Sequence, residues 1–279
     1  MELAGIALRL LVYLQSGLLL GVLLFWAPRT RQVRHSAVAL AAAGITLNVL
    51  TMLLLAASFS EGGAFFDAPI LWMLLSQTAM GWAAIARTAA YIVLIAFMVK
   101  DARRAFASIA ALTATGTLCW NGHGVMTDDG MGWVHLAANA LHLIAGLSWI
   151  GAIAAFLWAA MWPNGSAHAL SITLERFAKT GTSLVAILLA TGIINTFFIV
   201  GWDGMLSLTN TIYGRVLLIK ICLFAAMLAA AAANRFWLSA RLAASSSFGA
   251  LRISLGAELI LGVGVLVLVS LLGTLDPTQ

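Results

Sequence analysis

Apolar residues fill long stretches of this chain, and short polar segments separate them. Eight stretches come close to or exceed the roughly 20 apolar residues that a helix needs to cross a bilayer. They are residues 6–26, 37–58, 82–99, 105–121, 133–159, 178–200, 213–236 and 253–274. We therefore predict an all-α fold, a polytopic transmembrane helical bundle of about eight spans.

Two further segments each require a separate prediction. The stretch 69–80 (PILWMLLSQTAM) is too short to cross a bilayer, so we expect it to lie at the membrane interface ahead of the third span. The first fifteen residues, MELAGIALRLLVYLQ, have no basic segment and no clear cleavage site. We read them as part of a retained first span and not as a signal peptide.

Composition agrees with a fold inside lipid. Of the 279 residues, 62% are hydrophobic and only 9% are charged, whereas about a quarter of the residues in soluble domains are charged. No segment is long and polar enough to form a soluble domain, so residues 1–279 are expected to form a single integral membrane domain. The net charge of +5 is scattered and forms no basic stripe, which excludes a nucleic-acid surface.

Charge in the predicted loops sets the orientation. Arginine and lysine gather in the loops 27–36, 100–104 and 237–252, with a weaker contribution from 160–177. The intervening loops carry aspartate and glutamate and no lysine or arginine. Because cytoplasmic loops are enriched in basic residues, we expect both termini to lie outside, in the periplasm.

Several ionisable or amide side chains fall within predicted spans, where a charge costs about 2.5–3.5 kcal/mol near the centre of a helix. They are Arg9, Arg87, His142, Arg215, Lys220 and Glu258, with the amides of Asn48, Gln77, Asn139 and Asn195. Arg9 and Arg215 are near enough to the outer edge for their charged ends to reach water. Arg87 and Lys220 are deeper and require a partner or a wet cavity, while Glu258 is placed to pair with a basic residue.

Three histidines form the most chemically suggestive pattern. His123, His135 and His142 follow one another across the outer end of the fourth span, a short loop and the fifth span. His135 and His142 are seven residues apart, which places them on one face of a helix but about 10.8 Å apart, too far to bind one metal ion. They could mark successive stations on a path inward, or His142 could be a packing histidine bonded to an amide.

The outer loop adds sulfur and oxygen atoms to these imidazoles. Met126 and Met131 lie close to His123, and Asp128 and Asp129 lie between the two methionines. Imidazole with thioether suits copper, whereas carboxylates suit harder ions or simply solvate a loop. No nucleophile–base motif, phosphate-binding loop or zinc spacing occurs, so we expect a protein that is not an enzyme.

Motifs in the second half resemble those of a known family. The stretch ALHLIAGLSWIG (140–151) resembles the LHLLAAxxWLGG hallmark of the copper resistance protein D (CopD) family, and GHG (122–124) resembles the glycine–histidine that precedes it. Further family-like motifs follow in order: TGIIN (191–195), YGRVLLIK (213–220), ANR (233–235) and RISLGAE (252–258). The resemblance covers roughly residues 120–275, the region similar to the family core.

The resemblance implies a bacterial inner-membrane protein of about eight spans that handles copper, with a separate periplasmic CopC-like copper-binding protein as its partner. His123 and His142 match the family histidines, whereas His135, Met126 and Met131 are inferred from their chemistry alone. Two positions depart from the pattern. Asn139 stands where the family often has an acidic residue, and Ala152 replaces the second glycine of the hallmark.

The leading hypothesis is therefore copper import from the periplasm toward the cytoplasm, contributing to copper homeostasis and resistance. His123, His135, His142, Met126 and Met131 are the candidate ligands, Asn139, Asn195, Thr191 and Met52 the expected path lining, and Lys220, Arg215 and Glu258 the charged residues along or beside the path. The mainly positive charges oppose a cation path. They leave two alternatives open: a haem-binding or electron-transfer protein, and a membrane anchor for a periplasmic copper protein.

Overall fold

The computed structural model describes residues 2–26, 31–60, 66–100, 104–121, 130–162, 167–206, 208–238 and 249–276, and these segments are almost entirely helical. In chain order the helices are α1 (Glu2–Leu20), η1 (Gly21–Phe25), α2 (Arg31–Phe59), α3 (Ala68–Gln77), α4 (Ala79–Val99), α5 (Arg104–Gly116), η2 (Thr117–Asn121), α6 (Gly132–Met161), α7 (Ala167–Leu206), η4 (Leu208–Asn210), α8 (Ile212–Ala233), η5 (Asn234–Leu238) and α10 (Gly249–Leu272). No strand occurs in these segments, so the predicted all-α membrane bundle is confirmed.

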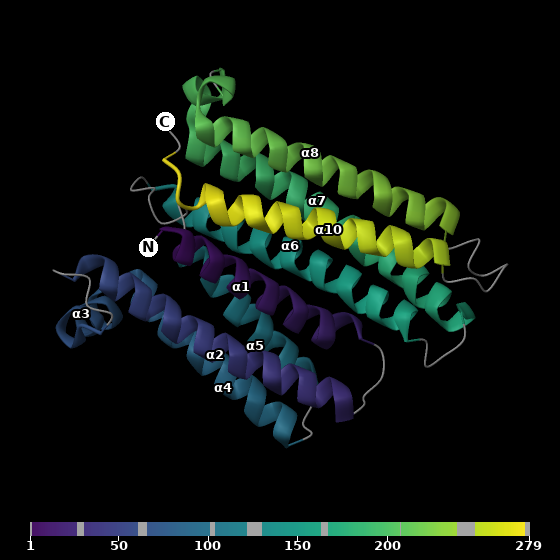
Figure 1. Cartoon of the computed structure of the whole chain (residues 1–279), viewed down its shortest axis with the longest axis horizontal. Coiled ribbons are helices and arrows are strands. Elements are labelled where there is room, and N and C mark those ends of the chain that lie inside the picture. Colours follow the sequence, from purple (N-terminus) through teal and green to yellow (C-terminus); the bar gives the residue numbers. More distant parts are fainter. Residues whose placement is uncertain are drawn as a thin grey trace.

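Within the described segments, seven helices are long and apolar enough to cross a membrane. The remaining predicted span, residues 105–121, is a shorter α-helix of 13 residues, α5, followed by the five-residue 3-10 helix η2. The long helices run roughly side by side, and the two chain ends lie at the same end of the bundle (Figure 1). We call this the terminal end, and the other the basic end, because most of the lysine and arginine side chains lie there.

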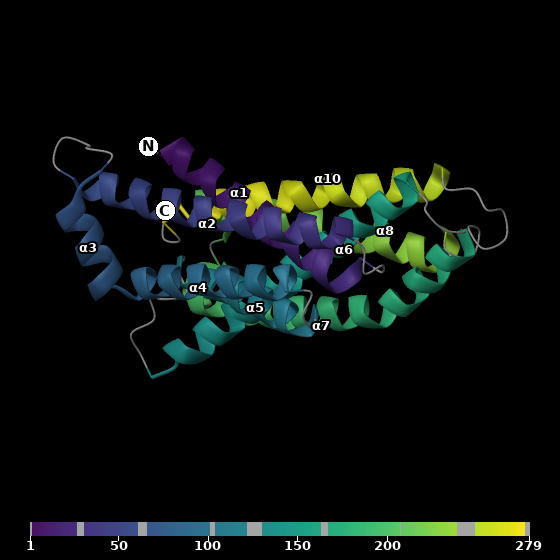
Figure 2. The same ribbon diagram turned by 90° about the horizontal axis from the view of Figure 1, so that it is seen from below.

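The helix α3 is the short apolar segment that the sequence predicted ahead of the third span. It lies across the terminal end between the ends of α2 and α4 (Figure 2). The carboxylate of Asp67 accepts a hydrogen bond from the Ile70 backbone N–H at 3.1 Å, which caps the first turn. The Thr78 hydroxyl caps α4 in the same way by accepting from the Gly81 N–H at 3.0 Å. Two capped starts so close together produce the sharp corner between α3 and α4.

Small residues let α1 and α6 cross in backbone contact. Gly17 of α1 and Gly21 of η1 are four residues apart, and both lie against Gly151 of α6. A Cβ atom on Gly151 would overlap the backbone oxygen of Gly17, and one on Gly21 would overlap the backbone of Gly151. This spacing of small residues is a common means of close helix packing in lipid, and it fixes α6 against the centre of the bundle.

Arginine side chains close helix ends at the basic end. Arg104, the first residue of α5, donates from Nε to the Leu23 carbonyl and from Nη2 to the Val22 and Trp26 carbonyls, each at 2.7 Å. Val22 and Leu23 belong to η1, and Trp26 directly follows it, where the last carbonyls of a helix lack intrahelical partners. Arg252 donates to the Ala160 carbonyl at the end of α6 at 2.8 Å. Both contacts place positive charge at a negative helix end.

Candidate functional site

The histidine face is the surface where α6 meets α7. Its α6 residues are His135, Asn139 and His142, and its α7 residues are Thr191, Asn195 and Phe198. In each set the residues are spaced by four and then by three positions, so they lie on one side of their helix. At one end of the face His142 contacts Thr191, and at the other end His135 stacks on Phe198. In each helix, the asparagine lies between these two contacts.

His142 makes the polar contact of this face. Its Nδ1 lies 2.9 Å from the Thr191 hydroxyl, and that hydroxyl lies 2.5 Å from the Ile187 carbonyl one turn earlier on α7. A hydroxyl has one proton, and the carbonyl can only accept it, so Nδ1 of His142 is the donor to Thr191. The proton is therefore on Nδ1, and Nε2 carries an unprotonated lone pair. An imidazole in this tautomer can bind a metal ion through Nε2.

His135 is held by aromatic stacking. Its side chain is 1% exposed, and its ring lies nearly parallel to that of Phe198, with the ring centroids 4.9 Å apart and 7° between the planes. It therefore sits inside the α6–α7 contact, two turns closer to the terminal end than His142. The two imidazoles lie on one face, as their spacing predicts, but each has its own surroundings.

The two asparagines of the face complete its polar atoms. The Asn139 side-chain amide lies 3.5 Å from the Cys119 carbonyl of η2, so it joins α6 to the end of the fourth predicted span. Asn195 is buried, and its side-chain oxygen accepts no hydrogen bond from any residue that the structure describes. A buried acceptor without a donor is costly, so the Asn195 oxygen is a point where a proton donor or a cation would be stabilised.

Two of the predicted ligands, His123 and Met126, lie in 122–129, outside the described residues. Met131 directly precedes α6 and is 51% exposed at the terminal end. In the described part of the chain, no three side chains from histidine, cysteine, aspartate and glutamate gather closely enough to hold a metal ion. Among the described residues, the histidine face therefore contains two separate imidazoles and no cluster of three such side chains.

The intramembrane cations are distributed unevenly about this face. Lys220 of α8 lies within electrostatic range of His142 and forms no hydrogen bond with a described residue. Arg215, on the first turn of α8, is exposed and donates from Nε to the Thr209 carbonyl at 3.1 Å. Of these two, only Lys220 contributes positive charge close to the histidines.

Arg87 belongs to a separate polar network, which sequence reasoning did not find. Its guanidinium donates to the Asn48 side-chain oxygen at 2.8 Å, to the Thr117 hydroxyl at 3.0 Å and to the Thr117 carbonyl at 2.8 Å. Asn48 in turn donates to the Ala84 carbonyl and to the Thr88 hydroxyl. A cation that is 1% exposed is thus satisfied by neutral acceptors from α2 and η2. The network ties these two elements to α4.

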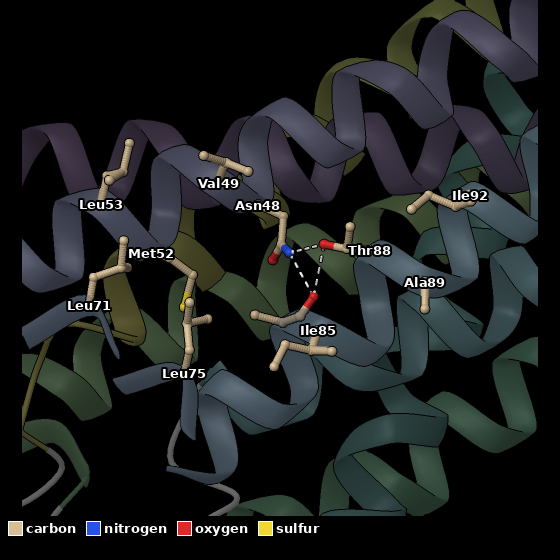
Figure 3. Close-up of a pocket in the computed structure, with 11 residues that line it drawn as sticks. Asn48, Val49, Met52, Leu53, Leu71, Leu75, Ile85, Thr88, Ala89 and Ile92 are labelled. Atoms are coloured by element: carbon tan, nitrogen blue, oxygen red, sulfur yellow. Dashed lines mark hydrogen bonds between the residues drawn. The ribbon is translucent and has the colours of Figure 1, made fainter. Parts of the chain in front are cut away.

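Met52 lies beside this network and not on the histidine face. It lines an apolar cavity of about 410 Å³ between α2, α3 and α4, where Figure 3 places it next to Leu71 and Leu75. Asn48 and Thr88 form the polar part of that lining through the hydrogen bonds drawn in the figure. The structure therefore does not bring Met52 together with the predicted ligands.

Glu258 takes part in a polar contact toward the basic end. It is buried on α10 and accepts a short hydrogen bond from the side-chain amide of Asn234 in η5. Among the described residues, Glu258 therefore bonds to an amide and not to the basic residue that the sequence predicted. The contact holds α10 against the end of α8. Neither Glu258 nor Asn234 belongs to the histidine face.

Comparisons with known proteins agree across the length of the chain. The family model described as "Copper resistance protein D-like, N-terminal domain" matches residues 1–133, and the one described as "Copper resistance protein D" matches residues 171–272. The stretch 140–151, the clearest family-like motif in the sequence, lies between the two matched ranges. The N-terminal match extends the resemblance beyond the motifs of the second half.

Three curated proteins are similar to this chain. It is 33% identical to Copper resistance protein D of Pseudomonas syringae pv. tomato over 98% of this chain and 96% of that protein. It is 31% identical to Inner membrane protein YebZ of Escherichia coli (strain K12) over 56% of this chain and 54% of that protein. It is 28% identical to Copper transport protein CutJ of Bacillus subtilis (strain 168) over 79% of this chain and 44% of that protein. No solved structure matches the chain significantly.

Proposed function

Because this chain belongs to the copper resistance protein D family, we propose that it carries copper ions across the inner membrane, from the periplasm toward the cytoplasm. The relatives named for copper transport and for the inner membrane support this choice of cargo and location. The proposal makes the protein a carrier and not an enzyme. The ion is its cargo, and the histidine face is its route between α6 and α7.

The observation that carries the proposal is the state of His142. Its Nδ1–H is held by Thr191, so Nε2 presents a lone pair inside a helix interface. Outer partners of this kind fix the orientation of an imidazole ligand and its tautomer. The Asn195 oxygen, one helical turn from Thr191 on α7, accepts no hydrogen bond in the described part of the chain and would be stabilised by a cation. One nitrogen and one oxygen bind weakly enough for an ion to leave, as transport requires.

The placement of the cations removes most of the objection to a cation path. Arg87 is enclosed in the network of Asn48 and Thr117, and Arg215 lies at the exposed start of α8. Lys220 remains within electrostatic range of His142 and opposes long residence of a cation there. We infer that the His142 station serves transit and not storage.

We propose eight passes through the bilayer, with both termini in the periplasm. Seven long helices and the shorter α5–η2 segment make an even number of passes, in keeping with chain ends at one end of the bundle (Figure 1). Most of the basic side chains in the described segments lie in the half of the bundle at the opposite end: Arg31, Arg34, Lys100, Arg104, Arg176, Lys179, Arg235 and Arg252. By the positive-inside rule that end faces the cytoplasm.

Capture at the periplasmic side is assigned to His123, Met126 and Met131, which precede α6 in sequence. Imidazole and thioether together suit copper, and thioether favours Cu(I). A separate periplasmic copper-binding protein of the CopC type would deliver the ion to this loop. His135 and then His142 would receive it along α6, two turns apart.

Metal content of the purified protein tests this function. The protein is purified in mild detergent after growth with copper, and copper and iron per chain are measured by elemental mass spectrometry. We expect copper that falls at least about tenfold in His142→Ala and is unchanged in His35→Ala, which removes an exposed histidine at the start of α2. Iron with a haem absorption band, in place of copper, would contradict the proposal and favour a haem protein.

Whole-cell copper tests the direction. Cells that express the protein should accumulate more copper than cells that express His142→Ala, provided that both proteins reach the membrane in equal amounts. Equal accumulation would favour a membrane anchor for a periplasmic copper protein. Lower accumulation in the wild type would reverse the proposed direction and leave the path in place.

A further inference from the structure

A second cavity, distinct from the histidine face, opens at the terminal end of the bundle. It has a volume of about 350 Å³ and lies between α1, the end of α2, the start of α4, η2 and the residues after α10. Its walls are apolar and are formed by Leu8, Val12, Leu54, Leu55, Met80 and Leu118. Its polar lining consists of Glu2, Arg9 and Tyr13 on one face of α1, with Thr51, Ser58, Asn121 and Thr274 from other elements. The hydroxyls of Thr51, Ser58 and Thr274 donate to carbonyls three or four residues earlier in the chain, so their protons are already used.

The polar groups on α1 follow a fixed order with depth. Glu2, Arg9 and Tyr13 all line the cavity, and spacings of seven and four place them on one side of the helix. Glu2 is exposed at the rim, whereas Tyr13 is 9% exposed at the floor. Arg9 is seven residues further in than Glu2, or about 10 Å at 1.5 Å per residue. From the rim inward the cavity thus presents a carboxylate, a guanidinium and a phenol.

These groups have unused hydrogen-bonding capacity. Among the residues that the structure describes, the side chains of Glu2, Arg9 and Tyr13 form no hydrogen bond. The side-chain oxygen of Asn121, which also lines the cavity, is buried and accepts no hydrogen bond in the described part of the chain. The lining of the cavity therefore includes a charged donor, a neutral donor and two acceptors that a ligand could satisfy.

The position of Arg9 is set by its neighbour. Its guanidinium lies directly against Gly273, just after α10, and a Cβ atom there would overlap Nη1. Tyr13 lies within electrostatic range of both Arg9 and the buried Arg87, so the floor of the cavity is a positive region. An anionic group is stabilised at this depth, and a cationic group is stabilised at the rim beside Glu2.

We propose that this cavity binds the headgroup of phosphatidylethanolamine from the surrounding leaflet. Its phosphate would accept from Arg9 and Tyr13, and its ammonium would donate to Glu2 and Asn121. In a bilayer the amine of this lipid lies outside its phosphate, the same order that Glu2 and Arg9 give. The acyl chains would pass the half-buried Leu8, Leu54 and Leu55 into the membrane. A trimethylated amine has no N–H to donate, and a glycerol headgroup has no positive charge.

Lipid retention measured by native mass spectrometry tests the proposal. The delipidated protein is mixed, without copper, with dioleoyl phosphatidylethanolamine, phosphatidylcholine or phosphatidylglycerol, so the result is independent of the transport function. We expect the wild type to bind phosphatidylethanolamine best. Arg9→Gln and Gly273→Ala should bind it about tenfold more weakly, because a charge-assisted contact to phosphate is lost. Arg215→Gln, which removes an arginine at the same end but outside the cavity, should bind as the wild type does.

Two milder variants keep the test decisive if Arg9→Gln does not fold. Tyr13→Phe removes one oxygen and should weaken phosphatidylethanolamine binding severalfold. Glu2→Gln should abolish the preference for phosphatidylethanolamine over phosphatidylcholine. Equal binding of the three lipids by the wild type would overturn the proposal, as would Tyr13→Phe and Glu2→Gln variants that bind as Arg215→Gln does. Competition by millimolar O-phosphoethanolamine as strong as that by the lipid would assign the cavity to a soluble ligand instead.

Discussion

Thr191 holds His142 in a single tautomer, since its hydroxyl accepts from Nδ1–H of His142 while donating to the Ile187 carbonyl. The contact crosses from α6 to α7, so the orientation of the imidazole depends on the packing of two helices. The lone pair of Nε2 is left for a ligand. The chemistry proposed for this face rests on that relationship more than on the number of histidines nearby.

Replacing Thr191 with valine should therefore weaken copper binding while leaving both histidines in place. Valine keeps the shape of the side chain and removes the acceptor for Nδ1–H. Loss of such an outer partner typically lowers metal affinity by about 10- to 100-fold. A competition titration with a Cu(I) chelator measures the change. Thr196→Val is the matched control, since the Thr196 hydroxyl bonds only to the Gly192 carbonyl of its own helix. Equal affinities in the two variants would show that Thr191 does not support the site.

Removing the amide of Asn48 should destabilise the protein without affecting copper. Asn48→Ala leaves Arg87 with one acceptor fewer in a buried site, at a cost of about 1–3 kcal/mol. Unfolding in mixed micelles with an increasing fraction of denaturing detergent measures the change in the free energy of unfolding. Asn195→Ala serves as the comparison, because the Asn195 oxygen accepts no hydrogen bond in the described residues. If Asn195→Ala lowered the free energy of unfolding as much as Asn48→Ala does, the structural role assigned to the Arg87 network would be refuted.

The backbone contact between α1 and α6 predicts a sharp difference between two glycines of the same helix. Gly151→Ala should cost about 1–3 kcal/mol of stability, because its Cβ meets the backbone of Gly17 and Gly21, which cannot move aside. Gly146→Ala should be nearly neutral, since its Cβ would meet only the Leu188 side chain at an ordinary 3.6 Å. Thermal unfolding in detergent compares the two variants. Similar melting temperatures would mean that the helices do not cross this closely.

Arg104 should prove more important for stability than its neighbour Lys100. Arg104→Gln removes charge-assisted hydrogen bonds to the carbonyls of Val22, Leu23 and Trp26, and we expect a loss of about 2 kcal/mol. Lys100→Gln, at the same end of the bundle, removes an exposed charge and should change stability little. The same denaturation series reports both values. Arg104→Lys should recover only part of the loss, because one ammonium cannot reach three carbonyls arranged as a fork.

The sequence pattern predicted the helices well because the bilayer itself imposes their length and polarity. The third predicted span, 82–99, is contained in α4, and the interfacial segment 69–80 overlaps α3 with boundaries shifted by one to three residues. The predicted fourth span was less regular than expected, since its last five residues form the 3-10 helix η2. Hydropathy does not distinguish the two kinds of helix, because both satisfy their backbone groups internally.

Contacts between helices were much harder to predict. The spacing of His135 and His142 indicated a shared face, but nothing in the spacing identified α7 as the facing helix or Thr191 as the partner of Nδ1. Arg87 was expected to need a partner, yet its acceptors come from residues 39 and 30 positions away in sequence. Gly17 and Gly21 carried a readable signal, a pair of small residues one turn apart, as did Gly151 and Ala155, but this spacing did not show that the two pairs belong to helices that cross each other.

Copper flux through the purified protein tests the central claim most directly. The wild type, His142→Ala and His35→Ala are reconstituted in liposomes of equal protein content, and entry of radioactive copper is followed in time. Our account predicts uptake by the wild type and by His35→Ala, and uptake near the level of empty liposomes for His142→Ala. Equal uptake by His142→Ala and the wild type would contradict the α6–α7 path, and no uptake by any of the three would contradict transport itself.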